Sequence, residues 1–86
     1  MSAGALPQRE PENIGSRVKR LRIEKGYSQD RLAIEAHMDQ SGLSKFERGG
    51  RGVGRIPLLR IASVLGIPFV DLISGTDFQE TGGIHA

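Results

Sequence analysis

The 86-residue chain has no cysteine, no tryptophan and only four aromatic residues, one Tyr and three Phe. The missing cysteine excludes disulfide bridges, thiolate metal sites and a thiol nucleophile, and it fits a reducing compartment. Apolar runs such as residues 67–70 are far shorter than the roughly 20 residues that a membrane span needs, and residues 1–12 lack the apolar stretch of a signal peptide. We therefore expect one small, soluble, cytoplasmic domain without a deep active site.

Charge is distributed unevenly along the chain. The net charge is +2, from 12 lysines and arginines against 10 aspartates and glutamates. Residues 13–60 hold eleven of the basic and five of the acidic residues, a net +6, whereas the residues after 60 carry a net −3. This asymmetry favours a polyanionic partner for the first part and another role, such as self-association, for the last third. Taken alone, the charge fits equally well a helical domain whose charges are simply solvated.

The order of apolar, capping and glycine residues predicts an all-α fold, a compact five-helix bundle. Ile14, Val18 and Leu21 recur at helical spacing, and Gly26 ends their helix. Polar side chains suited to N-capping precede the first three helices: Asn13, Ser28 and Asp39. With their caps, the first three helices are expected at about 13–25, 28–36 and 39–48. The fourth is expected to begin near Ile56 or Pro57 and to end at Gly66, and the fifth to cover about 68–73. No strand is expected.

The expected domain occupies residues 13–73, between two loose ends. Residues 1–12 combine small residues with prolines and have no periodicity, so we expect a disordered N-terminal arm. Residues 74–86 are polar and glycine-rich, so we expect a flexible C-terminal tail.

Residues 29–49 predict two short helices joined by a tight turn, an arrangement that presents the second helix to the major groove of DNA. Side chains that fix the crossing of such helices are apolar here: Leu32, Ala33, Ala36, Met38, Leu43 and Phe46. Gln40, Ser41, Ser44 and Lys45 fall on the exposed side of the second helix. Gln40 suits the edge of adenine, and Ser41 suits a purine acceptor or a phosphate. The plainer alternative is that both are ordinary polar residues at a helix start.

The segment from Gly49 to Arg55 is unusually rich in glycine. Glycine occupies four of the six positions from 49 to 54, alternating with Arg51 and Val53. This spacing forbids a stable helix and predicts a loop that bends sharply or closely approaches another group. A nucleotide-binding loop is a poor match, because no Walker-type lysine and no preceding strand are present.

Four segments carry a combined pattern: IGSRVKRLR, GYSQDRLA, DQSGLSKFERG and LLRIASVLGIPFVDLI. Together they resemble, over about residues 14–73, the Cro and lambda-repressor type of helix-turn-helix domain. The resemblance implies a five-helix bundle that dimerises and binds a pseudo-palindromic operator, usually as a transcriptional repressor. Two features depart from the family. His37 stands where the turn usually has glycine with positive φ, and the loop at 50–55 has more glycine and one residue more than is usual.

The resemblance also implies roles for individual side chains. Gln40 and Ser41 match positions that read bases, and Ser44 and Lys45 match positions that read bases or phosphates. Gln29 matches a glutamine that touches a phosphate and braces the DNA-contacting helix.

Two further sets complete the expected site. Arg22 and Glu47 match a partly buried ion pair that ties the first helix to the third. Besides Lys45, four arginines are expected to neutralise phosphates beside the groove: Arg17, Arg48, Arg51 and Arg55.

The expected partners are double-stranded operator DNA and a second copy of the chain, in the cytoplasm at the nucleoid. Apolar residues near the last helix exceed what a small core can hide and predict a homodimer interface: Ile67, Phe69, Val70 and Ile73. The alternative is an antitoxin that binds a toxin through its tails and autoregulates its operon. No catalytic set is present, and His37 and His85 lie far apart without other ligands. We therefore expect no enzyme, no cofactor and no metal.

Overall fold

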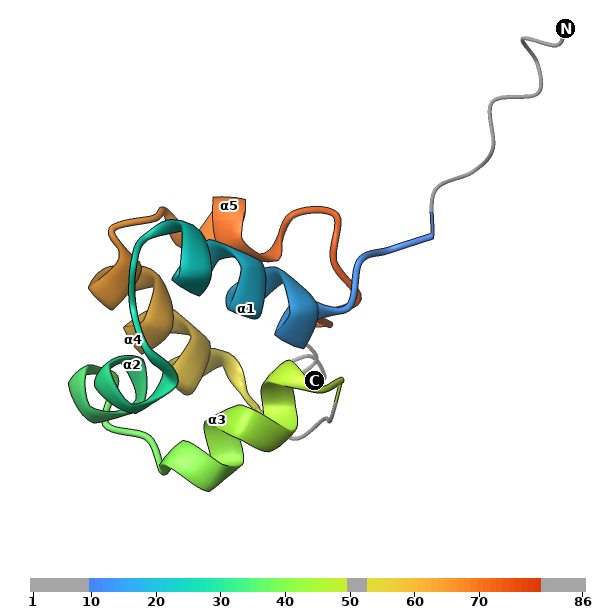
Figure 1. Ribbon diagram of the computed structural model, residues 1–86. Helices are drawn as coiled ribbons and strands as arrows, with labels where there is room; N and C mark the ends of the chain where they lie inside the picture. The colour runs from blue at the N-terminus through green and yellow to red at the C-terminus, as the bar shows by residue number, and fades with distance from the viewer. Residues whose placement is uncertain (1–9, 50–52, 80–86) are drawn as a thin grey trace, which may run out of the picture.

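The protein is built from five α-helices, as the computed structural model shows for residues 10–49 and 53–79 (Figure 1). They are α1 (Ile14–Glu24), α2 (Gln29–Glu35), α3 (Gln40–Glu47), α4 (Arg55–Leu65) and α5 (Phe69–Ile73). α1 and α2 pack against α3, and α4 packs against α5. α3 lies along one edge of the bundle and α5 along the opposite edge, and α1 contacts both (Figure 1). The predicted all-α five-helix architecture is confirmed.

Polar side chains cap the first three helices as the sequence predicts. Asn13, Ser28 and Asp39 each accept a hydrogen bond from the amide three residues further on. Each bond satisfies one of the amides that a helix start leaves without a partner. Gly66 ends α4 in the left-handed conformation, with φ at 69°. Once the capping residues are set aside, the first three helices have their expected limits. α4 begins at Arg55, one or two residues before its expected start.

His37 sets the turn between α2 and α3. Its φ is 58°, a left-handed value that histidine adopts more readily than most residues with a Cβ. The amide of Met38 then donates to the carbonyl oxygen of Ala33 at 2.8 Å, which satisfies the end of α2. The turn therefore has the positive φ typical of the motif, without its usual glycine.

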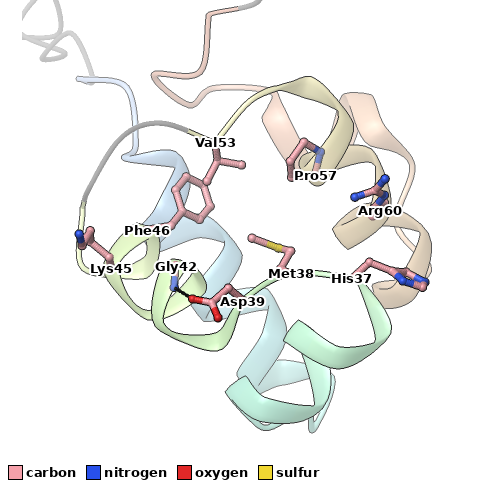
Figure 2. Close-up of a pocket in the computed structure, with 9 residues that line it drawn as sticks. All are labelled: His37, Met38, Asp39, Gly42, Lys45, Phe46, Val53, Pro57 and Arg60. Atoms are coloured by element: carbon pink, nitrogen blue, oxygen red, sulfur yellow. Dashed lines mark hydrogen bonds between the residues drawn. The ribbon is translucent and has the colours of Figure 1, made fainter.

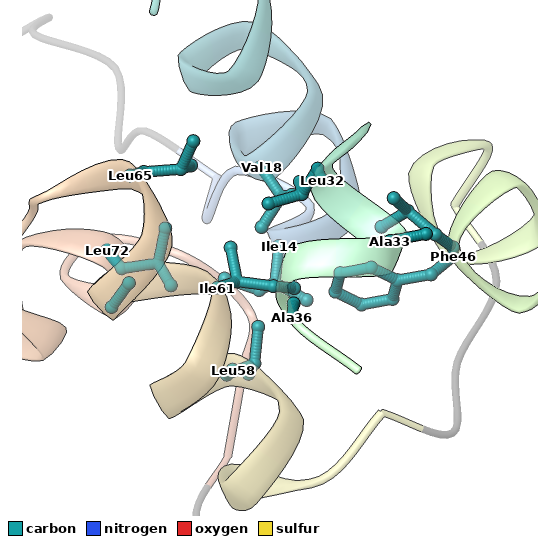
Figure 3. Close-up of a cluster of buried hydrophobic side chains, with 12 residues drawn as sticks. Ile14, Val18, Leu32, Ala33, Ala36, Phe46, Leu58, Ile61, Leu65 and Leu72 are labelled. Atoms are coloured by element: carbon teal, nitrogen blue, oxygen red, sulfur yellow. The ribbon is translucent and has the colours of Figure 1, made fainter. Parts of the chain in front are cut away.

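Twelve apolar side chains, contributed by all five helices and the end of α2, form one core (Figure 3). Five of the six side chains that the sequence predicts to be buried between residues 29 and 49 belong to it: Leu32, Ala33, Ala36, Leu43 and Phe46. Met38 is half-buried and packs against this cluster. The helix pair is thus fixed by contacts with the same core that joins α4 and α5.

α1 approaches the end of α3 most closely at Gly15. A Cβ at this position would lie 1.9 Å from the backbone oxygen of Phe46 and 2.8 Å from its carbonyl carbon. Because the obstacle is backbone, no change of side-chain rotamer relieves the clash. Glycine inside a helix costs roughly 0.5–1 kcal/mol relative to alanine. At Gly15 the missing side chain lets the backbones of α1 and α3 come into contact.

Residues from both ends of the described chain meet beside the start of α1. The amide of Glu12 donates to the carbonyl oxygen of Gly75 at 3.0 Å, and its own carbonyl oxygen accepts from the amide of Asp77 at 2.8 Å. The Asp77 carboxylate accepts from the amide of Ile14 at 2.8 Å, a second cap for α1. The Glu12 carboxylate accepts from Nε of Arg17 at 2.7 Å, and this hydrogen bond lowers the pKa of Glu12.

This clasp of Glu12 with residues 75–77 differs from the expected boundaries, which place Glu12 in a disordered arm and residue 74 onwards in a flexible tail. Glu12 and Thr76 instead form an isolated parallel bridge. A single bridge made by backbone groups has no side-chain periodicity, so the sequence does not reveal it. The rest of the expected arm and tail, residues 1–9 and 80–86, lies outside the described residues. Among the helices that are described, none has the length and apolar character to cross a bilayer.

We expect Gly15→Ala to separate α1 from α3 and to lower the free energy of unfolding by about 1–3 kcal/mol, the range for overpacked sites. The matched control is Gly42→Ala, because a Cβ there meets only the Cβ of Asp39, at 3.9 Å. This change should raise stability by about 0.5–1 kcal/mol through helix propensity. Urea unfolding followed by circular dichroism measures both, and equal effects would contradict the close approach.

The ion pair of Glu12 and Arg17 predicts an acid-dependent contribution to stability. Because the pKa of Glu12 is lowered in the folded protein, the contribution is present above the ordinary value of 4.5 and is lost as pH falls through the folded value. Because the carboxylate is 32% exposed, we expect the free energy of unfolding of wild type to exceed that of Glu12→Gln by less than about 1 kcal/mol at neutral pH. Urea unfolding across pH should show the two proteins converging below pH 4.5. A gap independent of pH would contradict the assignment.

Candidate nucleic-acid interface

The residues of α3 divide between two faces. The face toward the protein contains Leu43, Phe46 and Glu47. The opposite face, which we call the outer stripe, contains Gln40, Ser41, Ser44, Lys45 and, at the C-cap, Arg48. At about 100° per residue these positions follow one another along one side of the helix. All are exposed except Ser44, which is half-buried. The stripe therefore presents amide, hydroxyl and cationic groups together, as a DNA groove requires.

The start of α3 contains its own hydrogen-bonded turn. Asp39 accepts from the amide of Gly42 at 3.3 Å and from the hydroxyl of Ser41. The Ser41 bond is the larger cause of the lowered pKa of Asp39. Because the hydroxyl hydrogen of Ser41 is used, its oxygen is left to accept. Gln40 makes no side-chain hydrogen bond within the described residues, so both groups of its amide are available to a ligand.

Arg22 of α1 and Glu47 of α3 form a bidentate ion pair inside the protein. Nε of Arg22 donates to Oε2 of Glu47 at 2.7 Å, and Nη2 donates to Oε1 at 3.0 Å. Their side chains are 10% and 1% exposed. Nη1 of Arg22 also donates to the carbonyl oxygen of Tyr27 at 2.7 Å. The structural pair that the resemblance implies is therefore present, and it joins α1, the following loop and α3.

Gln29, at the start of α2, extends this network. Its Nε2 donates to Oε1 of Glu47 at 3.0 Å, which is the bracing contact that the resemblance implies. The side chain is half-buried, and its contact with a phosphate stays a prediction. Side chains of α1 and α2 thus both donate to the Glu47 carboxylate of α3, on the side of α3 away from the outer stripe.

Of the arginines predicted to bind phosphates, Arg48 lies on the outer stripe, where its Nη1 donates to the Ser44 hydroxyl at 3.2 Å. Arg17 lies elsewhere: it pairs with Glu12 and donates to the carbonyl oxygen of Asp71 at 3.1 Å, with 16% of its side chain exposed. This placement argues against the predicted phosphate role of Arg17, because the clasp already neutralises its charge.

The other two arginines, Arg51 and Arg55, belong to the glycine-rich segment from Gly49 to Arg55. The Arg55 guanidinium lies 5.1 Å from the centre of the Phe69 ring, so α4 begins with a cation–π contact to α5. The phosphate role of Arg55 stays a prediction. Arg51 lies outside the described residues.

The four apolar residues predicted for a dimer interface differ in exposure. Val70 is 63% exposed. Ile67, Phe69 and Ile73 are half-buried and pack against the core. Phe69 also contacts Phe78 edge to face, with 6.3 Å between the ring centres. Val70 is therefore the member of this set most available to a second copy.

Sequence reasoning missed three contributors to the geometry. A glycine in the first turn of a predicted helix is the available signal for Gly15. The other two have no local signal in the sequence. They are the Tyr27 carbonyl oxygen, which accepts a hydrogen bond from Arg22, and Asp77, which caps α1 from 63 residues away. No cluster of three potential metal ligands occurs within residues 10–49 and 53–79.

Comparisons with known proteins find relatives with a similar sequence and the same arrangement of helices. A family model described as helix-turn-helix matches residues 18–72. The HTH-type transcriptional regulator y4dJ of Sinorhizobium fredii is 39% identical over 64 residues, which cover 74% of this chain and 83% of that protein. The restriction-modification controller protein C.AhdI from Aeromonas hydrophila superposes with a TM-score of 0.67 at 37% identity, covering 70% of this chain and 91% of the other. SinR of Bacillus subtilis, solved in complex with DNA, gives 0.67 at 35% identity, covering 71% and 98%.

The chain therefore belongs to the helix-turn-helix family of DNA-binding transcriptional regulators. Within that family it is of the Cro and lambda-repressor type, with α2 and α3 as the helix-turn-helix pair.

We expect Glu47→Ala to lower the free energy of unfolding by about 3–5 kcal/mol, because it leaves the buried Arg22 charge without its partner. The control is Glu35→Ala, which breaks an exposed pair with Arg31 (41% and 57% exposed) and should cost about 0.5 kcal/mol or less. Thermal unfolding of both variants measures the contrast. An unchanged midpoint for Glu47→Ala would contradict the structural role of the pair.

Proposed function

We propose that this protein is a transcriptional repressor that binds a pseudo-palindromic operator as a homodimer, with α3 of each copy in a major groove. The observation that carries the proposal is the outer stripe, supported from behind by the buried Glu47. The solved complex of SinR with DNA supports the same use of the fold here. A dimer seated over a promoter excludes polymerase sterically, and this exclusion is the repression we infer.

Base reading is assigned to the first two turns of α3. Gln40 is exposed, and its amide can donate to N7 and accept from N6 of one adenine. Ser41 and Ser44 present hydroxyl oxygens on the same side, with Ser41 restricted to accepting while it donates to Asp39. Amide and hydroxyl groups of this kind give sequence preference rather than general affinity.

Phosphate contacts are assigned to the two cations of the outer stripe and to one amide beside it. Lys45 and Arg48 provide exposed cations at its far end, and Gln29 provides the free part of its amide at the start of α2. Each neutralised phosphate adds about 0.9 to the magnitude of the slope of log binding constant against log salt concentration. These residues position α3 without selecting the base sequence.

The homodimer is assigned to α5 and the residues before it. Val70 exposes most of an apolar side chain beside Ile67 and Ile73, each of which is half-buried. A twofold axis there would place the two copies of α3 in successive major grooves about 34 Å apart.

We expect Gln40→Ala to cost about 1–3 kcal/mol on the preferred duplex and to flatten the preference at one base pair of each half-site. Arg48→Gln is the matched change. It should weaken binding to all duplexes alike and reduce the slope of log binding constant against log salt concentration by about 0.9. Fluorescence anisotropy on the preferred duplex and its single-base variants distinguishes the two. If Gln40→Ala weakened every duplex equally, Gln40 would be a positioning residue.

We expect Val70→Asp to yield monomers that bind DNA weakly, because a charge in an apolar interface has no partner. Ile34→Asp is the control: Ile34 on α2 is 66% exposed, close to the 63% of Val70, but lies outside the proposed interface. Analytical ultracentrifugation gives the mass of each variant. A Val70→Asp protein that remains dimeric would move the interface away from α5.

A further inference from the structure

A cavity of about 330 Å³ lies behind α3, between the turn that precedes it and the start of α4 (Figure 2). Apolar side chains from all three segments surround it: Met38, Phe46, Val53 and Pro57. Its volume is at the lower end of the roughly 300–1,000 Å³ typical of ligand sites. The space therefore suits one ring or a short chain.

The walls of this cavity suit the apolar part of such a molecule. Phe46 is almost fully buried and contributes a flat ring, while Val53 and Pro57 are half-buried on the other side. Met38 is half-buried between them, and its unbranched thioether adapts to different shapes. A ligand here would remove apolar surface from water on several sides.

The rim of the cavity favours a negative charge. Lys45 and Arg60 both lie on it, and neither makes a hydrogen bond or ion pair within the described residues. The one rim carboxylate, Asp39, is already engaged by Ser41 and the amide of Gly42. Lys45 and Arg60 lie at opposite ends of the cavity (Figure 2), so each end offers one cation, while the rim carboxylate is satisfied by its own helix.

We propose that this cavity binds a small amphipathic carboxylate, with its apolar body against Phe46 and Met38 and its carboxylate at Arg60. Arg60 lies at the α4 end of the cavity, where it has no hydrogen-bond or ion-pair partner among the described residues, and the apolar side chains lie beside it (Figure 2).

The binding site is tested first, without DNA. The probe is 3-phenylpropionate, and 3-phenylpropionamide is the uncharged analogue of nearly equal shape. Titration followed by nitrogen-15 correlation spectra should give saturable shifts at the amides of Met38, Gly42 and Val53. The uncharged analogue should bind about tenfold more weakly or worse, because it loses charge-assisted hydrogen bonds. Absence of these shifts, or equal binding of both compounds, would overturn the site.

Variants then assign the charge. Arg60→Gln should weaken 3-phenylpropionate by about tenfold, whereas Lys25→Gln, at an exposed cation outside the cavity, should leave binding unchanged. Arg60 is exposed, so the variant is expected to fold, and its spectrum verifies this directly. Equal effects of the two substitutions would contradict the assignment of the carboxylate to Arg60.

Discussion

The orientation of α3 depends on the buried ion pair of Arg22 and Glu47. Taking two charges out of water is costly, and the cost is offset only when the geometry is good and the remaining polar atoms are satisfied. Here both carboxylate oxygens accept from Arg22, one also accepts from Gln29, and the third guanidinium nitrogen donates to a backbone carbonyl. Rotation of α3 about its axis would break several of these bonds together. The network therefore fixes which residues face outward.

The same short helix, α3, contacts three different surroundings. One side enters the core through Leu43 and Phe46, the opposite side forms the outer stripe, and the flank at Gly42 and Lys45 borders the cavity. Gly15 lets the backbone of α1 touch its end, so packing and ion pair act at neighbouring points. A ligand, a base or a phosphate that contacts α3 thus acts on an element with little freedom to tilt.

Sequence reasoning found what local chemistry dictates. Capping side chains and apolar spacing follow from residues a few positions apart, so the helices could be predicted. The positive φ of His37 is expected from the resemblance. The ion pair came from resemblance, because 25 residues separate its partners. The contacts of Arg17 and Glu12 could not be predicted for a related reason: their partners, Asp71 and Gly75, come from the far end of the chain. Exposed cations could be counted in the sequence, but which were already paired could not.

Selection of bound duplexes from a random pool, at about 0.15 M salt so that loose electrostatic binding is suppressed, tests the central claim most directly. The account predicts an enriched inverted repeat whose half-sites lie about 34 Å apart, one turn of the double helix. Salt-sensitive retention of DNA without any enriched sequence would contradict it, because an oriented α3 with free amide and hydroxyl groups must prefer some bases over others.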